Sequence, residues 1–104
     1  RVQALVRGIC CLVPGVPGVS ENISVISIVG RFLEHRRVFA FDIAGRQHMY
    51  SDSADWMPRN LNRRIEVVFP IEDEALRAQA TEILDLSFAD NVKARELRPD
   101  GTYV

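Results

Sequence analysis

Apolar residues at the start of the chain form a nearly continuous run. From Gln3 to Leu12 the run is broken only by Arg7 and Gly8, and it ends before residues 14–18, a Pro-Gly-Val-Pro-Gly loop. An apolar run between turn residues is typical of a central strand buried on both faces, and we predict such a strand here. Because a guanidinium is buried only with partners, we expect an anionic group to meet Arg7.

Alternating apolar residues later in the chain predict further strands. Arg37 to Ile43 and Gln47 to Ser51 flank the turn Ala44-Gly45-Arg46 and predict a β-hairpin. Residues 64–69 and 92–97 have the composition of two more strands.

Two segments between these strands have mixed patterns. Residues 23–29 are rich in β-branched residues, as strands are, but their apolar positions also fit a helical stripe. We expect a short helix or irregular turn that runs into residues 31–33. Residues 53–60 are polar and contain Pro58, so they predict a loop or a single turn, with Trp56 packed against the protein.

The clearest helical pattern covers residues 73–89. Asp73 is a suitable N-cap, and Glu74 adds a favourable negative charge in the first turn. The apolar stripe that we expect to face the core consists of Leu76, Ala80, Ile83, Leu84 and Phe88. The residues expected away from that stripe are Arg77, Glu82 and Asp85. We therefore predict one long amphipathic helix.

Together the elements predict an α/β protein in which a mixed β-sheet packs with helices in two layers. A length of 104 residues, with 47% hydrophobic and 26% charged residues, predicts a single domain over residues 1–104. No apolar run approaches the roughly 20 residues of a membrane-spanning helix, and no leader-like segment is visible. Since the chain opens with Arg1 rather than Met, we expect a fragment of a longer protein.

The net charge of −1 combines two segments of opposite sign. Residues 1–64 carry nine arginines against five acidic residues, a balance of +4, and residues 65–104 carry four basic against nine acidic residues, a balance of −5. The first segment can attract an anion, although uneven charge is also common in small domains. Basic and aromatic residues do not interleave, which argues against a nucleic-acid-binding protein.

The two cysteines, Cys10 and Cys11, are adjacent in the sequence. Neighbours in a strand point to opposite faces, so we do not expect them to form a disulfide with each other. They lack the spacing of a zinc site, and they indicate a reducing, cytoplasmic compartment.

The segment Leu33-Glu34-His35-Arg36-Arg37 is the strongest candidate for chemistry. Imidazole and guanidinium groups together suit an oxyanion such as phosphate. A solvated surface histidine between ordinary arginines is the structural alternative. His35-x-Arg37, followed after four residues by Asp42, resembles the His-x-Lys-four-Asp motif of phospholipase D-like enzymes. Arg replaces Lys here, and one degenerate motif argues against independent phosphodiesterase activity.

Longer stretches resemble the last domain of the bacterial polyphosphate kinases of the long, histidine-phosphorylated class. These stretches follow the order of that family and cover nearly the whole chain: residues 7–12 with 14–18, residues 27–35, residues 53–60 and residues 90–95. Within them, Arg7 matches the arginine of an Arg-Gly-x-Cys-Cys motif and His35 the histidine of Leu-Glu-His. The 28 positions between Arg7 and His35 equal the separation that the family shows.

This resemblance implies the fold of a phospholipase D-like half-domain, and it implies which reaction the complete enzyme catalyses. The reaction is reversible transfer of the terminal phosphate of ATP to inorganic polyphosphate through a phosphohistidine. Arg7 and His35 are the implied ATP- and phosphate-binding residues, and no catalytic residue or metal ligand is expected within the 104 residues. The phosphohistidine and the Mg²⁺ site would lie outside them, so we expect the chain alone to be inactive.

The resemblance also implies binding partners and a cellular location, and it leaves competing functions open. ATP, polyphosphate, preceding domains of the same chain and a homo-oligomer are the expected partners, with no nucleic acid and no membrane span. We expect a cytoplasmic location, with peripheral attachment to the inner membrane as an open alternative. The competing functions are a non-catalytic scaffold or oligomerisation module, in which the acidic helix contacts another domain or subunit, and a degenerate phosphodiesterase domain.

Overall fold

The computed structural model describes residues 1–8, 10–32, 35–53 and 57–104. The chain forms two compact units, the first comprising residues 1–33 and 85–104 and the second residues 34–84. Each unit contains one three-stranded β-sheet. The fold is therefore mixed α/β, as predicted, but it has two sheets where a single mixed sheet was expected.

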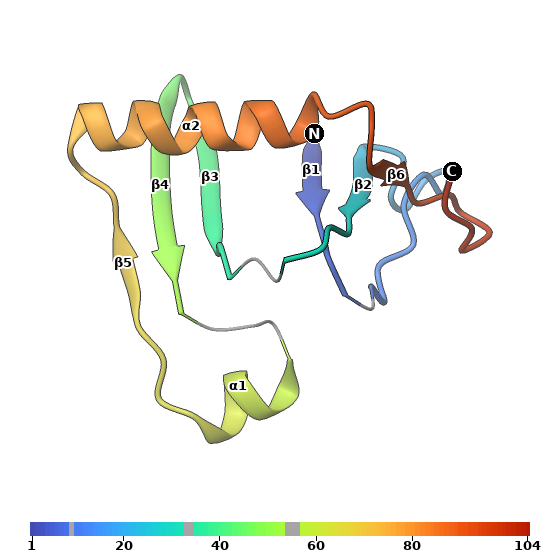
Figure 1. The fold of residues 1–104 in the computed structure, drawn as a ribbon, viewed down its shortest axis with the longest axis horizontal. Coiled ribbons are helices and arrows are strands. Elements are labelled where there is room, and N and C mark those ends of the chain that lie inside the picture. Colours follow the sequence, from blue (N-terminus) through green and yellow to red (C-terminus); the bar gives the residue numbers. More distant parts are fainter. Residues whose placement is uncertain (9, 33–34, 54–56) are drawn as a thin grey trace. The chain divides into compact units, whose positions relative to one another are not determined.

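The sheet of the first unit is built around its central strand. It consists of β1 (Val2–Leu5), β2 (Ile23–Ile28) and β6 (Ala94–Glu96), in the order β1-β2-β6. Strand β1 runs parallel to β2, whereas β6 runs antiparallel to it (Figure 1). Because a parallel connection must cross from one end of the sheet to the other, the long segment between β1 and β2 is required by this topology.

The core of the first unit lies along β2. Val25 is completely buried, and Leu97, whose amide donates to the Val25 carbonyl, is 7% exposed. The crossover segment is held by Ser20, which is also buried: its Oγ donates to the carbonyl of Val13 at 2.6 Å and accepts from the amide of Val16 at 3.0 Å. The buried Ser20 hydroxyl both donates and accepts a hydrogen bond, so its burial carries no free-energy penalty for an unpaired polar group. Ser20 therefore stabilises the Pro-Gly loop.

The sheet of the second unit is antiparallel. It consists of β3 (Val38–Ile43), β4 (Arg46–Asp52) and β5 (Val68–Pro70), in the order β3-β4-β5. The turn between β3 and β4 has positive φ at both central residues, 52° at Ala44 and 78° at Gly45. Two positive φ values match the right-handed twist of a hairpin, although a positive φ is strained for the alanine in the first position.

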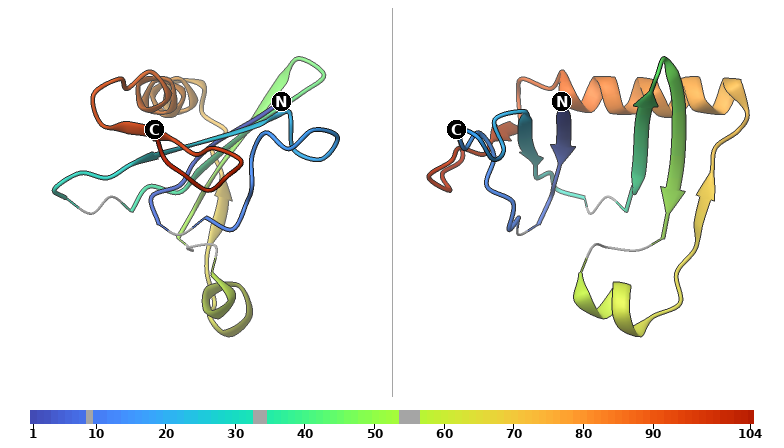
Figure 2. Two further views of the ribbon diagram at one scale, coloured as in Figure 1. Left: turned by 90° about the vertical axis from the view of Figure 1, so that its right-hand side faces the viewer. Right: turned by 180° about the vertical axis from the view of Figure 1, so that it is seen from behind.

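The second unit also contains helical residues. Helix α1 (Pro58–Arg63) begins with a proline, whose missing N–H is unneeded there, and it lies beyond the end of the sheet that is opposite the hairpin turn (Figure 2). The long helix α2 (Glu74–Phe88) begins after Asp73, whose Oδ1 accepts from the amide of Leu76 at 3.0 Å. The predicted N-cap and the predicted helix are both confirmed.

The half-buried stripe of α2 differs from the predicted one. It consists of Arg77, Ala80, Thr81, Leu84, Ser87 and Phe88. Leu76 and Ile83, which were predicted in the stripe, are 55% and 39% exposed. Arg77 was expected to face solvent, but its Nη1 donates to the carbonyl of Gln47 at 3.2 Å. The aliphatic stem of an arginine can lie along a packed surface, and a polar–apolar pattern does not anticipate this.

Two predictions near the N-terminus are wrong. Strand β1 is an edge strand of four residues, with Val2 52% and Leu5 36% exposed, and it is not a central strand over residues 3–12. Residues 23–28 form the central strand rather than a helix or turn. Their β-branched side chains suit a strand with hydrogen-bonded neighbours on both sides. In this segment the strand preference of the side chains outweighs the helical spacing of the apolar positions.

The remaining elements are close to their predictions. The hairpin is confirmed, with Arg46 inside β4 rather than in the turn. Strands β5 and β6 are shorter than the predicted strands at 64–69 and 92–97, and β5 includes Pro70, which edge strands tolerate. The predicted packing of Trp56 lies outside the described residues.

Among the described side chains of the second unit, Met49 is the most buried apolar one at 2% exposed, and this gives a test of the fold. We expect Met49→Ala to lower the free energy of unfolding by about 2–5 kcal/mol, because it leaves a cavity beneath the hairpin. Urea unfolding would measure the change. The neighbouring Gln47→Ala, at an exposed position, should stay within about 0.5 kcal/mol of the unchanged protein. Equal effects of the two substitutions would contradict this packing.

The turn before β6 gives a second test, in its pH dependence. The amide of Val92 donates to Asp90 Oδ1 at 2.9 Å, and this bond holds the pKa of the Asp90 carboxyl below its usual value. A lowered pKa in the folded state stabilises the protein above the pKa of the unfolded state, and that contribution is lost as the pH falls. We therefore expect Asp90→Asn to lose less thermal stability between pH 7 and pH 3 than the unchanged protein does. Identical losses in melting temperature would contradict it.

Candidate functional site

Arg7 lies just after β1 and connects the ends of two strands. It is half-buried, its Nη1 donates to the carbonyl of Phe32 at 2.7 Å, and its Nη2 donates to the carbonyl of Gly30 at 3.3 Å. Gly30 and Phe32 follow β2, and β1 and β2 are parallel. Parallel strands place their carboxyl ends at one edge of a sheet, which is where ligands bind in open α/β sheets.

The described partners of Arg7 are two neutral carbonyl oxygens. The anionic group that we expect to meet Arg7 stays a prediction. A guanidinium has five N–H donors, so the two bonds orient the group without using all of its donors. The oriented group retains its positive charge and a planar arrangement of N–H groups, which suits phosphate oxygens.

A second guanidinium lies in the same segment of the first unit. The Arg31 guanidinium carbon is 5.6 Å from the centroid of the Phe32 ring, a cation–π distance, and both side chains are exposed. Arg31 therefore adds positive charge next to the residue whose carbonyl holds Arg7. A polyanion would find two cationic groups at this edge of the sheet.

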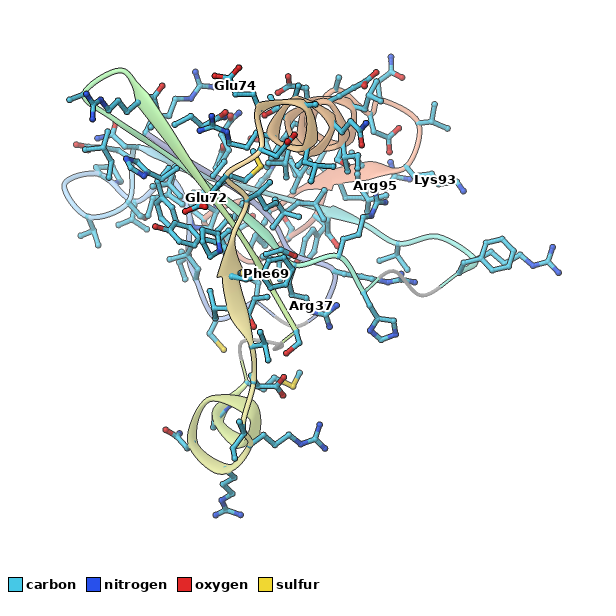
Figure 3. The ribbon with its side chains drawn as sticks, turned by 90° about the vertical axis from the view of Figure 1, so that its left-hand side faces the viewer. Arg37, Phe69, Glu72, Glu74, Lys93 and Arg95 are labelled. Carbon is cyan, nitrogen blue, oxygen red and sulfur yellow. The ribbon has the colours of Figure 1, made fainter. Side chains whose placement is uncertain are left out.

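His35 belongs to the second unit, three positions before β3, and its side chain is exposed. The backbone that follows it is fixed, because the carbonyl of Arg37, a residue labelled in Figure 3, accepts from the Ser51 hydroxyl and from the Asp52 amide, each at 3.1 Å. These bonds connect the beginning of β3 to the end of β4. His35 is therefore presented to solvent from a segment whose next residues are tied to the sheet.

Arg7 and His35 lie in different units, and each is described within its own unit. That they form one phosphate site therefore stays a prediction. Leu33 and Glu34, which precede His35 in the candidate segment, lie outside the described residues.

The phospholipase D-like motif does not gather its members at one point. His35 precedes β3, whereas Asp42 is near the hairpin turn at the other end of that strand, opposite Gln47. At about 3.3 Å per residue, seven positions of extended chain place the two side chains roughly 20 Å apart. Asp42 therefore cannot act on the same reacting atom as His35.

Ser53 is hydrogen-bonded within a loop, and His48 lies on a strand. The Ser53 hydroxyl donates to Glu66 Oε2 at 2.5 Å and accepts from the Val67 amide at 3.1 Å, so it shapes the loop. His48 is exposed on β4. Asp55 lies outside the described residues.

Metal-binding clusters and membrane-spanning helices are absent from the described residues. Within residues 1–8, 10–32, 35–53 and 57–104, no three His, Cys, Asp or Glu side chains gather as ligands of a metal ion. In the same ranges, no helix is long and apolar enough to cross a membrane. The described residues that follow β1 and β2 offer positive charge and N–H donors.

The sequence did not identify Gly30 and Phe32 as the residues that hold Arg7. They act through backbone carbonyls, so their side-chain chemistry gives no direct signal. The available clue was the position of Arg7 inside an apolar run, which indicated that a partner must exist but not which one.

Comparison with known proteins gives consistent matches over the whole chain. The profile of a family described as Polyphosphate kinase C-terminal domain 2 matches residues 1–104. A polyphosphate kinase of Synechocystis sp. is 55% identical over 104 residues, which cover 100% of this chain and 14% of that protein. A polyphosphate kinase of Bacillus anthracis is 52% identical over 103 residues, which cover 99% of this chain and 15% of that protein. The chain thus spans about 14% of the length of such relatives.

A solved structure is also similar. The crystal structure of polyphosphate kinase from Porphyromonas gingivalis matches with a TM-score of 0.91 and 41% sequence identity, over 98% of this chain and 16% of that chain. The family resemblance inferred from the sequence is therefore confirmed.

The bonds of Arg7 predict an effect on the segment after β2. Lysine has a single ammonium group and cannot donate in the geometry of a planar fork to two separate carbonyls. We expect Arg7→Lys to lower the ¹⁵N order parameters of Gly30, Arg31 and Phe32 to below about 0.6, the range of flexible backbone. Arg46→Lys, at an exposed position in the other unit, is the matched control and should leave them unchanged. Unaltered order parameters in Arg7→Lys would show that the two bonds do not hold this segment.

Proposed function

This chain belongs to the Polyphosphate kinase C-terminal domain 2 family, and we propose that Arg7 and His35 bind phosphate groups of ATP in the complete enzyme. The reaction they serve is reversible transfer of the terminal phosphate of ATP to inorganic polyphosphate. It proceeds through a phosphohistidine outside these 104 residues.

The observation that carries this proposal is the orientation of the Arg7 guanidinium. Two carbonyls hold it at the carboxyl edge of parallel strands, half-buried and with N–H groups left for a ligand. Phosphoryl transfer depends mainly on positioning and on neutralising charge at phosphate oxygens. A guanidinium fixed before the ligand arrives loses little conformational entropy on binding, so it is well suited to this task.

His35 complements Arg7 chemically. An imidazole near neutral pH can donate to a phosphate oxygen, or it can supply a proton to the leaving oxygen. Its exposed position three residues before β3 allows either role. Arg36 and Arg37 would extend the positive surface along polyphosphate.

The rest of the machinery is assigned to other parts of the enzyme. The described residues contain no metal-binding cluster, so Mg²⁺, which would neutralise phosphate charge, is expected to bind elsewhere. The chain is proposed as a phospholipase D-like half-domain that works with the preceding domains, in a cytoplasmic homo-oligomer, and is inactive alone.

Substitution in the full-length enzyme tests the two assignments together. We expect Arg7→Ala to lower kcat/KM for ATP by about 100-fold, since loss of a charge-assisted contact costs about 3 kcal/mol. His35→Ala is expected to lower it by about 10- to 100-fold. The matched controls Arg46→Ala and His48→Ala remove exposed groups of the same kinds and should change it less than about threefold.

A third variant separates the two roles of His35. If it only donates a hydrogen bond, His35→Gln should recover much of the activity, whereas a proton donor would not be replaced. Wild-type turnover in a correctly folded Arg7→Ala enzyme, with folding checked by circular dichroism, would sink the proposal.

A further inference from the structure

Phe32, four residues after the end of β2, contacts two guanidinium groups in two different ways. Its carbonyl accepts a hydrogen bond from Nη1 of Arg7 at 2.7 Å. Its ring lies beneath the guanidinium of Arg31, with 5.6 Å between the guanidinium carbon and the ring centroid. The carbonyl of Gly30, on the other side of Arg31 in the sequence, accepts from Nη2 of Arg7 at 3.3 Å. Arg31 is therefore the middle residue of the short segment that Arg7 holds.

The ring of Phe32 is in solvent rather than in the core of the first unit. Phe32 is 76% exposed, and Arg31 is exposed as well. A phenyl ring that stays mostly in water contributes little hydrophobic stabilisation. It does attract a cation to its face, and this attraction limits the conformations of the guanidinium. An exposed ring with a cation over it is thus better suited to orienting Arg31 than to packing.

We infer that Arg31 binds a phosphate group of the substrate next to the one that Arg7 meets, and that Phe32 positions both guanidiniums. This inference rests on the proposed function of Arg7 and adds two residues to it. Like charges in one short segment repel each other, and a bound polyanion removes that repulsion. The chemistry recognised is a chain of phosphate groups, which both ATP and polyphosphate carry.

The two arginines differ in burial in a way that suits a linear chain of phosphates. Arg7 is half-buried at the edge where the parallel strands β1 and β2 end, whereas Arg31 is exposed. The arrowheads of the two strands point the same way in Figure 1. One phosphate at the half-buried guanidinium leaves the next phosphate of the chain closer to solvent, where the exposed guanidinium can meet it.

Steady-state kinetics of the full-length kinase test the contact. We expect Arg31→Ala to raise the KM of one substrate by about 5- to 20-fold, because a charge-assisted contact at an exposed position is lost. The kcat should change by less than about twofold, since such a contact binds the ground state and the transition state alike. ATP is varied at saturating polyphosphate, and polyphosphate at saturating ATP. The substrate whose KM rises is the one whose phosphate Arg31 binds.

Two variants control for charge. Arg98 is an exposed arginine of the same unit, and the antiparallel register of β6 places it toward the start of β2, at the opposite end of the sheet. Arg98→Ala should change either KM by less than about twofold. Arg31→Lys keeps the positive charge and should stay within about threefold of the unchanged enzyme. The effect of Arg31→Ala should shrink as the ionic strength rises, because exposed charges are screened.

A double-mutant cycle tests Phe32 as a positioning residue. Phe32→Leu keeps the backbone carbonyl and an apolar side chain but removes the ring, so we expect it to raise the same KM by about two- to fivefold, the size of an exposed cation–π contact. If the ring acts through Arg31, the combined variant should match Arg31→Ala within about twofold. A ring with a merely structural role would give effects that multiply.

Several results would overturn the inference. Unchanged KM values for both substrates in a folded Arg31→Ala enzyme, with folding checked by circular dichroism, would exclude the phosphate contact. An equal rise in Arg98→Ala would show that loss of positive charge anywhere in the unit is responsible. Multiplying effects in the cycle would exclude the positioning role of Phe32. An impaired Arg7→Ala enzyme beside an unchanged Arg31→Ala enzyme would contradict the role of Arg31 alone, whereas wild-type turnover in Arg7→Ala would contradict the proposed function.

Discussion

The parallel pairing of β1 with β2 is the constraint on which the candidate site depends. Parallel strands require a crossover, and the segment from Val6 to Asn22 provides it, fixed by the buried Ser20. The same pairing brings the residues after both strands to one edge of the sheet. Arg7 can therefore reach the carbonyls of Gly30 and Phe32, although 23 and 25 positions separate them in the chain.

Among the residues that the structure describes, packing is concentrated in a few side chains. Val25 and Leu97 form the core of the first unit, and Met49 is buried in the second. Burial of so few large side chains contributes little toward the conformational entropy lost on folding.

The candidate residues include both rigid and exposed groups. Arg7 is oriented by the backbone and Arg31 is exposed in the first unit, and His35 is exposed in the second. Within the first unit, this combination suits a polyanionic ligand, because fixed charge gives orientation and exposed charge adds attraction over a longer range. No member of this set requires a metal ion held by the chain itself.

The sequence by itself determined the family, the hairpin and α2 with its Asp73 cap, because local patterns and turn chemistry specify these features. It also singled out Arg7 as a charge in an apolar run. Only the tertiary structure decided that β1 is a short edge strand, that residues 23–28 form a central strand, and that Arg77 lies in the half-buried stripe of α2. Strand order and the partners of a long side chain depend on distant residues, and hydrophobic periodicity carries no information about them. For the same reason, the carbonyls that hold Arg7 became visible only when β1 and β2 were seen side by side.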